Sequence, residues 1–172
     1  IKKGNTKDMA LVYSEKPCVA AGTFTTNVVK AAPVKWDQHI VYDAPTAQAI
    51  VCNSGVANAC TGEEGYGYCK ETAKIAAESL QIPEDSVLVA STGVIGKQLP
   101  MDLLGAGIKN LVPLLSHTRE AGKLAAQSIM TTDTVSKEVA VTMEIGGKTV
   151  TLGGMCKGSG LSLIHISEPT RL

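Results

Sequence analysis

Residues 137–154 read KEVAVTMEIGGKTVTLGG, and in this stretch the spacing of apolar residues changes from a helical to a strand period. The apolar side chains alternate with polar or small ones, at Val139, Val141, Met143 and Ile145 and then at Val150 and Leu152. The Gly146-Gly147 pair separates the two runs, and this combination is typical of a β-hairpin. We therefore predict a hairpin at residues 139–152 that leads directly into the lysine-containing stretch GGMCKGSG.

Upstream of the hairpin, three segments have the apolar period of amphipathic helices. They are ETAKIAAESLQ (71–81), PMDLLGAGIKNLVPLL (100–115) and REAGKLAAQSIM (119–130). Short apolar runs followed by turn-forming residues predict strands at HIVYDA (39–44), AIVCNS (49–54) and SVLVAS (86–91). Because helices and strands are mixed without a linker, we expect one α/β (α+β) unit with helices layered on a β core.

The composition and charge of the chain argue against several classes of partner and site. The 172 residues include 16 basic and 16 acidic side chains, so the net charge of zero favours neither nucleic acid nor an anionic membrane as a partner. No apolar run approaches the ~20 residues of a membrane span. The five cysteines are not spaced as zinc ligands, and their odd number without a signal-peptide pattern favours reduced thiols in the cytoplasm. We expect these cysteines to be buried as small apolar residues.

The stretch ASTGVIG (90–96) follows a predicted strand and precedes a predicted helix. We expect Ser91, Thr92 and Gly93 in the turn at the strand end, a common place for ligands. A Thr-Gly pair there can aim a hydroxyl and a backbone N–H at one point, which would form an oxyanion hole. The same residues are also typical of an ordinary strand-to-helix turn, so their sequence alone does not distinguish the two.

Other polar stretches are likewise compatible with either a ligand site or an ordinary structural role. CNSGVANACTG (52–62) and MTTDT (130–134) could bind a ligand or could form turns and helix ends. Lys157 in GGMCKGSG suggests a phosphate loop, but GGKT (146–149) lacks the leading glycine of a P-loop because position 142 is Thr. The histidines lie at positions 39, 117 and 165, outside any G-x-S-x-G nucleophile motif, which argues against a Ser-His-Asp hydrolase.

Taken in order, six segments resemble one family, the glutamate N-acetyltransferases (ornithine acetyltransferases) of arginine biosynthesis. They are IKKGNTKDMALVYSE, AAGTFTTNVVKAAPV, AIVCNSGVANACTG, VLVASTGVIGKQLPMD, IMTTDTVSKEV and GGMCKGSG. The resemblance implies the fold of the N-terminal-nucleophile-like aminopeptidase type. It implies a precursor that cuts itself before a threonine, whose freed hydroxyl becomes the nucleophile.

Acetyl would then move from N2-acetylornithine to that threonine and on to glutamate. The resemblance implies that Thr92 and Gly93 form the oxyanion hole and that Thr131 and Lys157 contact the substrate. It implies no cofactor, although acetyl-CoA could serve as a co-substrate. The implied partner is the β chain of the same precursor, in an α2β2 heterotetramer.

The resemblance stops at Gly160, where the family continues with a segment like M-I-H-P-N-M-A-T and this chain with LSLIHISEPTRL. The family's nucleophilic threonine would fall on Glu168. We therefore expect residues 1–160 to be most of an α chain, residues 161–172 to be a non-native tail that packs poorly, and the chain alone to be inactive. Three alternatives remain: an inert structural partner of a β chain, a parent with acetyl-CoA-dependent N-acetylglutamate synthase activity, and a related N-terminal-nucleophile aminopeptidase.

Overall fold

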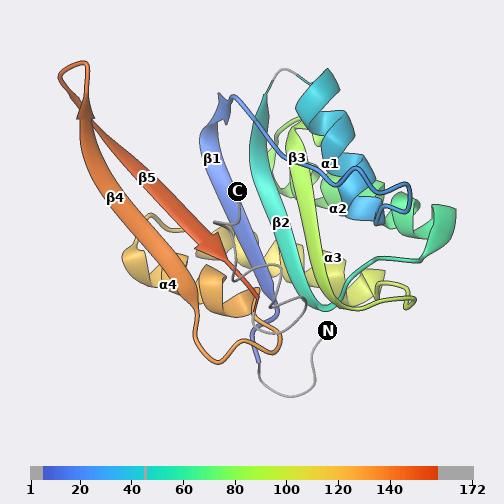
Figure 1. Ribbon diagram of the computed structural model, residues 1–172. Coiled ribbons are helices and arrows are strands. Elements are labelled where there is room, and N and C mark those ends of the chain that lie inside the picture. The colour runs from blue at the N-terminus through green and yellow to red at the C-terminus, as the bar shows by residue number, and fades with distance from the viewer. Residues whose placement is uncertain (1–5, 45, 159–172) are drawn as a thin grey trace, which may run out of the picture.

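The computed structural model describes residues 6–44 and 46–158, which form a three-stranded sheet, a separate two-stranded hairpin and four α-helices (Figure 1). The predicted mixed helix–sheet fold is confirmed. The elements are β1 (Met9–Cys18), α1 (Ala32–Asp43), β2 (Ala47–Val56), α2 (Gly62–Leu80), β3 (Val87–Val94), α3 (Met101–Leu111), α4 (Arg119–Ser128), β4 (Lys137–Ile145) and β5 (Lys148–Cys156), with 3-10 turns at Glu84–Ser86 and Val112–Leu114. Residues 161–172, the expected tail, lie outside the described residues.

The central sheet has the order β1-β2-β3, with β1 antiparallel and β3 parallel to β2. Its core face carries Ala49 and Val51 of β2 and Val87 and Val89 of β3, all at most 4% exposed. Helices α1, α2 and α3 pack their apolar residues into the same core cluster. In Figure 1 the hairpin lies beyond β1, on the side away from β2 and β3, and α4 lies near β1 and the start of β4.

The strand predicted at residues 39–44 is wrong, because these residues end helix α1. Trp36 and Ile40 are four residues apart and buried, so HIVYDA is the second half of a helical stripe rather than a strand. Pro33 lies in the first turn of the helix, where a missing N–H costs nothing. The Trp36 indole N–H donates to the Val87 carbonyl at 2.9 Å, which attaches α1 to β3.

The other predicted elements are present with shifted ends. Helix α2 begins at Gly62, nine residues before the predicted start at residue 71, because its glycine-rich first half resembles a turn in sequence. Helix α3 ends at Leu111 rather than at residue 115, and a 3-10 turn containing Pro113 follows it. A proline cannot donate the next helical hydrogen bond. Helix α4 is capped by Thr118, whose hydroxyl accepts from the Ala121 N–H.

The predicted hairpin is confirmed as β4 and β5, paired antiparallel from Lys137 opposite Cys156 to Ile145 opposite Lys148. Gly146 and Gly147 have φ values of 59° and 73°. Two successive positive φ angles are those of a type I′ turn, which glycine adopts without strain. The pairing therefore brings Lys157, just after β5, back to the level where β4 begins.

The expectation that all cysteines are buried is wrong for three of them. Cys52 and Cys69 are buried, whereas Cys18, Cys60 and Cys156 are exposed. Burial and, to a lesser extent, the nearby Asp37 carboxylate raise the pKa of the Cys52 thiol to about 11 and that of the Cys69 thiol to about 12. Both thiols therefore stay protonated at neutral pH. None of the helices formed by the described residues is long and apolar enough to cross a membrane.

Asp37 makes the stability of the fold depend on pH. Burial raises the pKa of this carboxyl from its ordinary 3.8 to about 6, although one oxygen accepts the Val89 N–H at 2.9 Å. The unfolded chain loses this proton at lower pH, so the contribution of Asp37 to the free energy of unfolding falls as pH rises from about 4 to 6. We expect Asp37→Asn, which keeps an acceptor for Val89, to stabilise the chain at neutral pH by roughly 1–2 kcal/mol after allowance for solvent screening.

Urea unfolding of the Asp37→Asn variant at pH 7 and near pH 4 checks this prediction, because the gain should vanish at the lower pH. The control is Asp43→Asn, which removes an exposed carboxylate of the same helix. An equal gain at both pH values would contradict the assignment.

Candidate active site

The candidate site lies where β2 and β3 run side by side toward their carboxyl ends. Ser54 pairs with Thr92 and Gly55 with Gly93 in the parallel ladder. The prediction that Ser91, Thr92 and Gly93 lie in a turn is therefore wrong, because β3 continues to Val94. The sheet rather than a loop fixes these residues, which holds any group on them more rigidly than a turn would.

Gly93 is required by its surroundings. Its φ is +135°, and a Cβ atom added to it would lie 2.3 Å from the Gly55 carbonyl carbon. Only glycine allows both this backbone angle and this close approach of two strands. The Thr-Gly pair singled out in the sequence therefore has a glycine that the fold itself demands.

Lys157 reaches Thr92 from the segment that follows β5. Its Nζ atom donates to Thr92 Oγ1 at 3.3 Å, across 65 residues of sequence. Both side chains are partly buried. Two of the four residues proposed from the sequence are thus in contact, one from β3 and one from the segment after β5.

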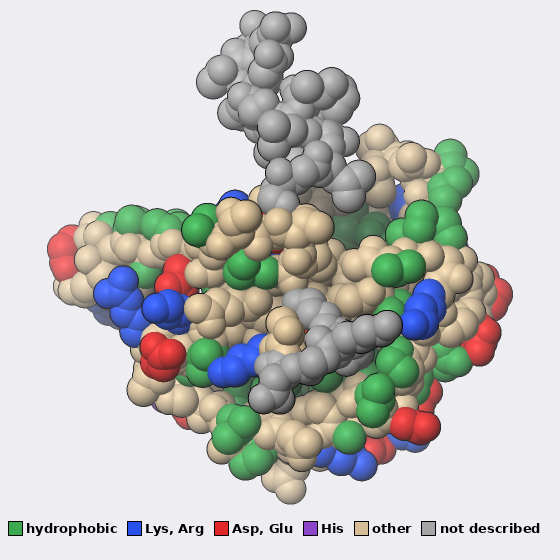
Figure 2. All heavy atoms as spheres, turned by 90° about the horizontal axis from the view of Figure 1, so that it is seen from below, with side chains coloured by type: hydrophobic (Ala, Val, Ile, Leu, Met, Phe, Trp, Pro, Cys, Tyr) green, Lys and Arg blue, Asp and Glu red, His purple; other side chains and the backbone are tan. Residues whose placement is uncertain are grey.

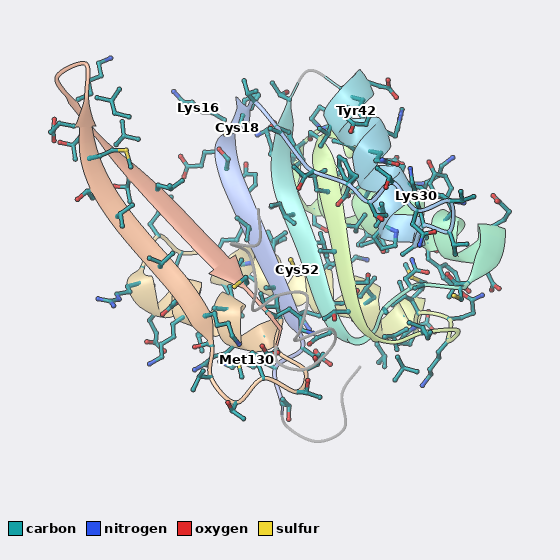
Figure 3. The ribbon with its side chains drawn as sticks, in the orientation of Figure 1. Lys16, Cys18, Lys30, Tyr42, Cys52 and Met130 are labelled. Atoms are coloured by element: carbon teal, nitrogen blue, oxygen red, sulfur yellow. The ribbon has the colours of Figure 1, made fainter. Side chains whose placement is uncertain are left out.

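Thr131 lies apart from this pair. It is exposed and lines an open pocket of about 560 Å³, formed by Thr6 and by residues of α4 and the α4–β4 connection. Figure 3 places Met130, another lining residue, at the end of α4 close to the start of β4. Among the described residues no direct hydrogen bond joins Thr131 to Thr92 or Lys157.

Asp133 connects the two regions, although it was proposed only as part of the stretch MTTDT. Its side chain is fully buried, and it accepts from Lys137 Nζ at 2.7 Å, from the Gly158 N–H at 2.6 Å and from the Thr131 N–H at 3.3 Å. The bonds from Lys137 and then Gly158 hold the pKa of this carboxyl well below its usual range, so it is ionised at neutral pH. A lysine four residues after the aspartate was the only local signal in the sequence.

The buried polar side chains of the stretch at residues 52–62 make structural contacts. Ser54 is fully buried and donates to the Ser128 carbonyl at 2.6 Å, which ties the end of α4 to β2. Asn58 is also buried and donates to the Gly65 carbonyl and to Cys69 Sγ, while Thr61 donates to Asn58. These side chains satisfy backbone and neighbouring groups, and their polar atoms are used inside the protein.

The surface seen from below the strand ends carries charges of both signs, interspersed over largely neutral side chains and backbone (Figure 2). Within residues 6–44 and 46–158, no group of three or more His, Cys, Asp or Glu side chains could hold a metal ion. The polar groups near Thr92 and in the pocket include hydroxyls, the Lys157 ammonium, the Gln127 amide and the Asp133 carboxylate, which is paired with Lys137. Hydroxyls and an ammonium can bind small molecules that carry carbonyl and carboxylate oxygens.

Comparison with known proteins places these residues in a family. The family model described as the ArgJ family matches residues 1–167, a range that extends beyond Gly160 into the segment that the structure does not describe. The chain is 51% identical over 173 residues to the arginine biosynthesis bifunctional protein ArgJ of Symbiobacterium thermophilum, and 48% identical over 171 residues to that of Thermotoga neapolitana. Each match covers 99% of this chain but only 42% of the relative, so the chain spans less than half of the length of these relatives.

Two solved structures have the same fold. The crystal structure of the arginine biosynthesis bifunctional protein ArgJ from Bacillus halodurans matches with a TM-score of 0.86 and 41% identity, covering 92% of this chain and 82% of that one. The ornithine acetyltransferase of Mycobacterium tuberculosis, solved in complex with ornithine, matches with a TM-score of 0.84 and 43% identity, covering 90% of this chain and 81% of that one. The chain therefore belongs to the ArgJ family and shares the fold of these ornithine acetyltransferase structures.

Proposed function

We propose that this chain is the α-chain part of an acetyltransferase that moves acetyl from N2-acetylornithine to glutamate. The observation that carries the proposal is the contact between Lys157 Nζ and Thr92 Oγ1, which joins a motif residue of β3 to one in the segment after β5. Family membership and the likeness to an ornithine acetyltransferase solved with ornithine support the choice of substrate.

In this proposal Thr92 and Gly93 bind the carbonyl oxygen that becomes negative during acetyl transfer. The Thr92 oxygen accepts from the Lys157 ammonium, which leaves the Thr92 hydroxyl proton free to point at a substrate oxygen. An ammonium on the accepting side also polarises the hydroxyl and makes it a better donor. The Gly93 N–H is the second donor of the proposed hole.

Lys157 has a second proposed role as the cation for a substrate carboxylate. An ammonium carries three donors, so it can bind Thr92 and a carboxylate at once. Thr131 is proposed to contact the same substrate from the neighbouring pocket, whose lining includes the hydroxyls of Thr6, Thr134 and Ser136. Asp133 joins the backbones of the two regions.

The proposed enzyme contains a second chain that supplies the nucleophilic threonine. The lengths of the matches support this division, because the chain covers 42% of the Symbiobacterium relative but 82% of the solved Bacillus chain. A solved chain about half as long as the curated proteins is expected if the precursor is cut in two. We propose self-cleavage before a threonine as the origin of the two chains, and an α2β2 assembly.

A chimera tests the proposed function. Residues 6–158 replace the matching segment of the Symbiobacterium relative, to which the chain is 51% identical. Purified chimera is incubated with N2-acetylornithine and glutamate, and N-acetylglutamate and ornithine are measured, with acetyl-CoA tested separately as donor. Stoichiometric formation of both products supports the proposal, and a folded, cleaved chimera that forms neither would refute it.

Lys157→Met in the chimera is expected to raise the KM for N2-acetylornithine, because the ammonium meets a carboxylate that is already present in the ground state. Loss of one charge-assisted contact of this kind corresponds to roughly tenfold to a hundredfold. Steady-state kinetics of the variant measures the effect. The control is Lys74→Met, an exposed lysine of α2 that pairs with Glu78, and an unchanged KM in Lys157→Met would argue against the carboxylate role.

A further inference from the structure

The proposed oxyanion hole and substrate contacts do not account for the hydrogen bonds of the Asp133 carboxylate. Its carboxylate is fully buried, and its Oδ1 atom accepts from both Lys137 Nζ and the Gly158 N–H. Lys137 is the first residue of β4, and Gly158 follows the end of β5 by two positions. The carboxylate therefore closes the open end of the hairpin, opposite the Gly146-Gly147 turn.

The closed end of the hairpin determines where the Lys157 side chain can reach. Lys157 immediately precedes Gly158, and the β4–β5 ladder ends one residue earlier at Cys156. A lysine side chain is a flexible four-carbon stem with four rotatable bonds. Its ammonium is held in one place only if the backbone at its base is also held. The described contacts that hold the chain at this point are the Gly158 N–H bond to Asp133 and the Lys157 bond to Thr92.

The second oxygen of Asp133 extends the same control to the pocket. Oδ2 accepts the Thr131 N–H at 3.3 Å, so one side chain is bonded to the backbone beside both proposed substrate contacts. A buried carboxylate suits this task, because it accepts several N–H groups at once and charge-assisted bonds are shorter and stronger than neutral ones. A neutral side chain of the same size offers one acceptor oxygen instead of two.

We propose that Asp133 is a positioning residue for Lys157, whose carboxylate holds the backbone at Gly158 against the start of β4 and so places the Lys157 ammonium at Thr92. The proposal rests on the proposed substrate role of Lys157 for its kinetic consequence. Its structural part stands on the contacts alone. Asp133 does not touch the reacting atoms and acts through its neighbour.

The structural part is tested by NMR spectroscopy on the 172-residue chain. A through-hydrogen-bond scalar coupling between the Gly158 nitrogen and the Asp133 carboxyl carbon is expected in the unsubstituted chain, and its absence overturns the proposal whatever the variants do. In Asp133→Asn the Gly158 amide is expected to exchange faster with solvent, and the nuclear Overhauser contact between the Lys157 ε-methylene and the Thr92 methyl should weaken. Asp43→Asn, which removes an exposed carboxylate of α1, is the matched control and should change neither signal.

The kinetic part is tested by a double-mutant cycle in the chimera. Asp133→Asn alone is expected to raise the KM for N2-acetylornithine about tenfold and to lower kcat as well, because the displaced Lys157 ammonium no longer polarises the Thr92 hydroxyl. In a Lys157→Met background the same substitution should raise KM much less, because the part of its effect that acts through Lys157 is already lost and only its bond to the Thr131 N–H remains. Independent, multiplicative effects of the two substitutions on KM would overturn the proposal.

The two tests separate this inference from the proposed function. If the unsubstituted chimera transfers no acetyl, the proposed function fails, and the coupling, amide exchange and Lys157–Thr92 contact in the chain alone decide the role of Asp133. If the chimera is active but Asp133→Asn leaves KM and the Gly158 amide unchanged, the positioning role fails and the proposed function stands.

Discussion

Thr92→Ala is expected to lower kcat for acetyl transfer about a hundred- to a thousandfold, or about 2.7–4 kcal/mol, with a smaller change in KM. The carbonyl oxygen gains its negative charge mainly in the transition state, so a lost oxyanion donor slows the chemical step more than it weakens binding. The substitution should leave the fold intact, because Thr92 is only partly buried and its one described side-chain bond is the one to Lys157.

The Thr92 measurement needs an enzyme that is already mature. If self-cleavage uses the same donors, a Thr92→Ala precursor would stay uncut and its inactivity would say nothing about acetyl transfer. The chimera is therefore made as two co-expressed chains, the second of which begins with its threonine. Thr92→Ser is the matched control, since it keeps the hydroxyl and should retain most of the rate. If the Thr92→Ala variant kept the wild-type kcat, the Thr-Gly pair would have only a structural role.

Gly93→Ala is expected to have the largest effect on stability. The added Cβ would lie 2.3 Å from the Gly55 carbonyl carbon and 2.7 Å from the Val56 nitrogen, both of them backbone atoms of the neighbouring strand. Strain from the positive φ and separation of the two central strands together should cost on the order of 3–5 kcal/mol. Urea unfolding of the 172-residue chain, followed by circular dichroism, measures the loss.

Gly96→Ala separates the two causes. Gly96 also has a positive φ, +71°, but nothing lies within 4 Å of a Cβ added there. It should show only the cost of the left-handed backbone, roughly 1–2 kcal/mol. If both variants lose the same stability, the close approach of β3 to β2 is not what makes Gly93 necessary.

The sequence predicted well those features that depend on neighbours along the chain. The alternation from Val139 to Leu152 and the Gly146-Gly147 pair predicted the hairpin and its turn, because a two-residue loop and a period of two are local properties. The apolar spacing within residues 71–81 likewise predicted part of α2. Local spacing misled at residues 39–44, where a short apolar run fits half a helical stripe as well as it fits a strand.

The candidate site was predicted only in part. Thr92, Gly93, Thr131 and Lys157 came from the resemblance of motifs, and their roles remain predictions. The structure shows Thr92 and Gly93 inside β3 rather than in a turn, since strand length depends on the pairing with β2. Asp133 was proposed only as part of the stretch MTTDT and received no role of its own, because one aspartate among threonines is typical of any helix end.

By itself, the sequence determined which segments form helices α2 to α4 and the hairpin, and which residues belong to the family's motifs. Only the tertiary structure decided that Lys157 meets Thr92 across 65 residues, that Gly93 lies against the Gly55 backbone, and that Asp133 joins Gly158 to the start of β4. The reason is physical. Periodicity records which side of one element is buried, whereas a contact between elements depends on how strands pair and how helices pack, and these are properties of the whole chain.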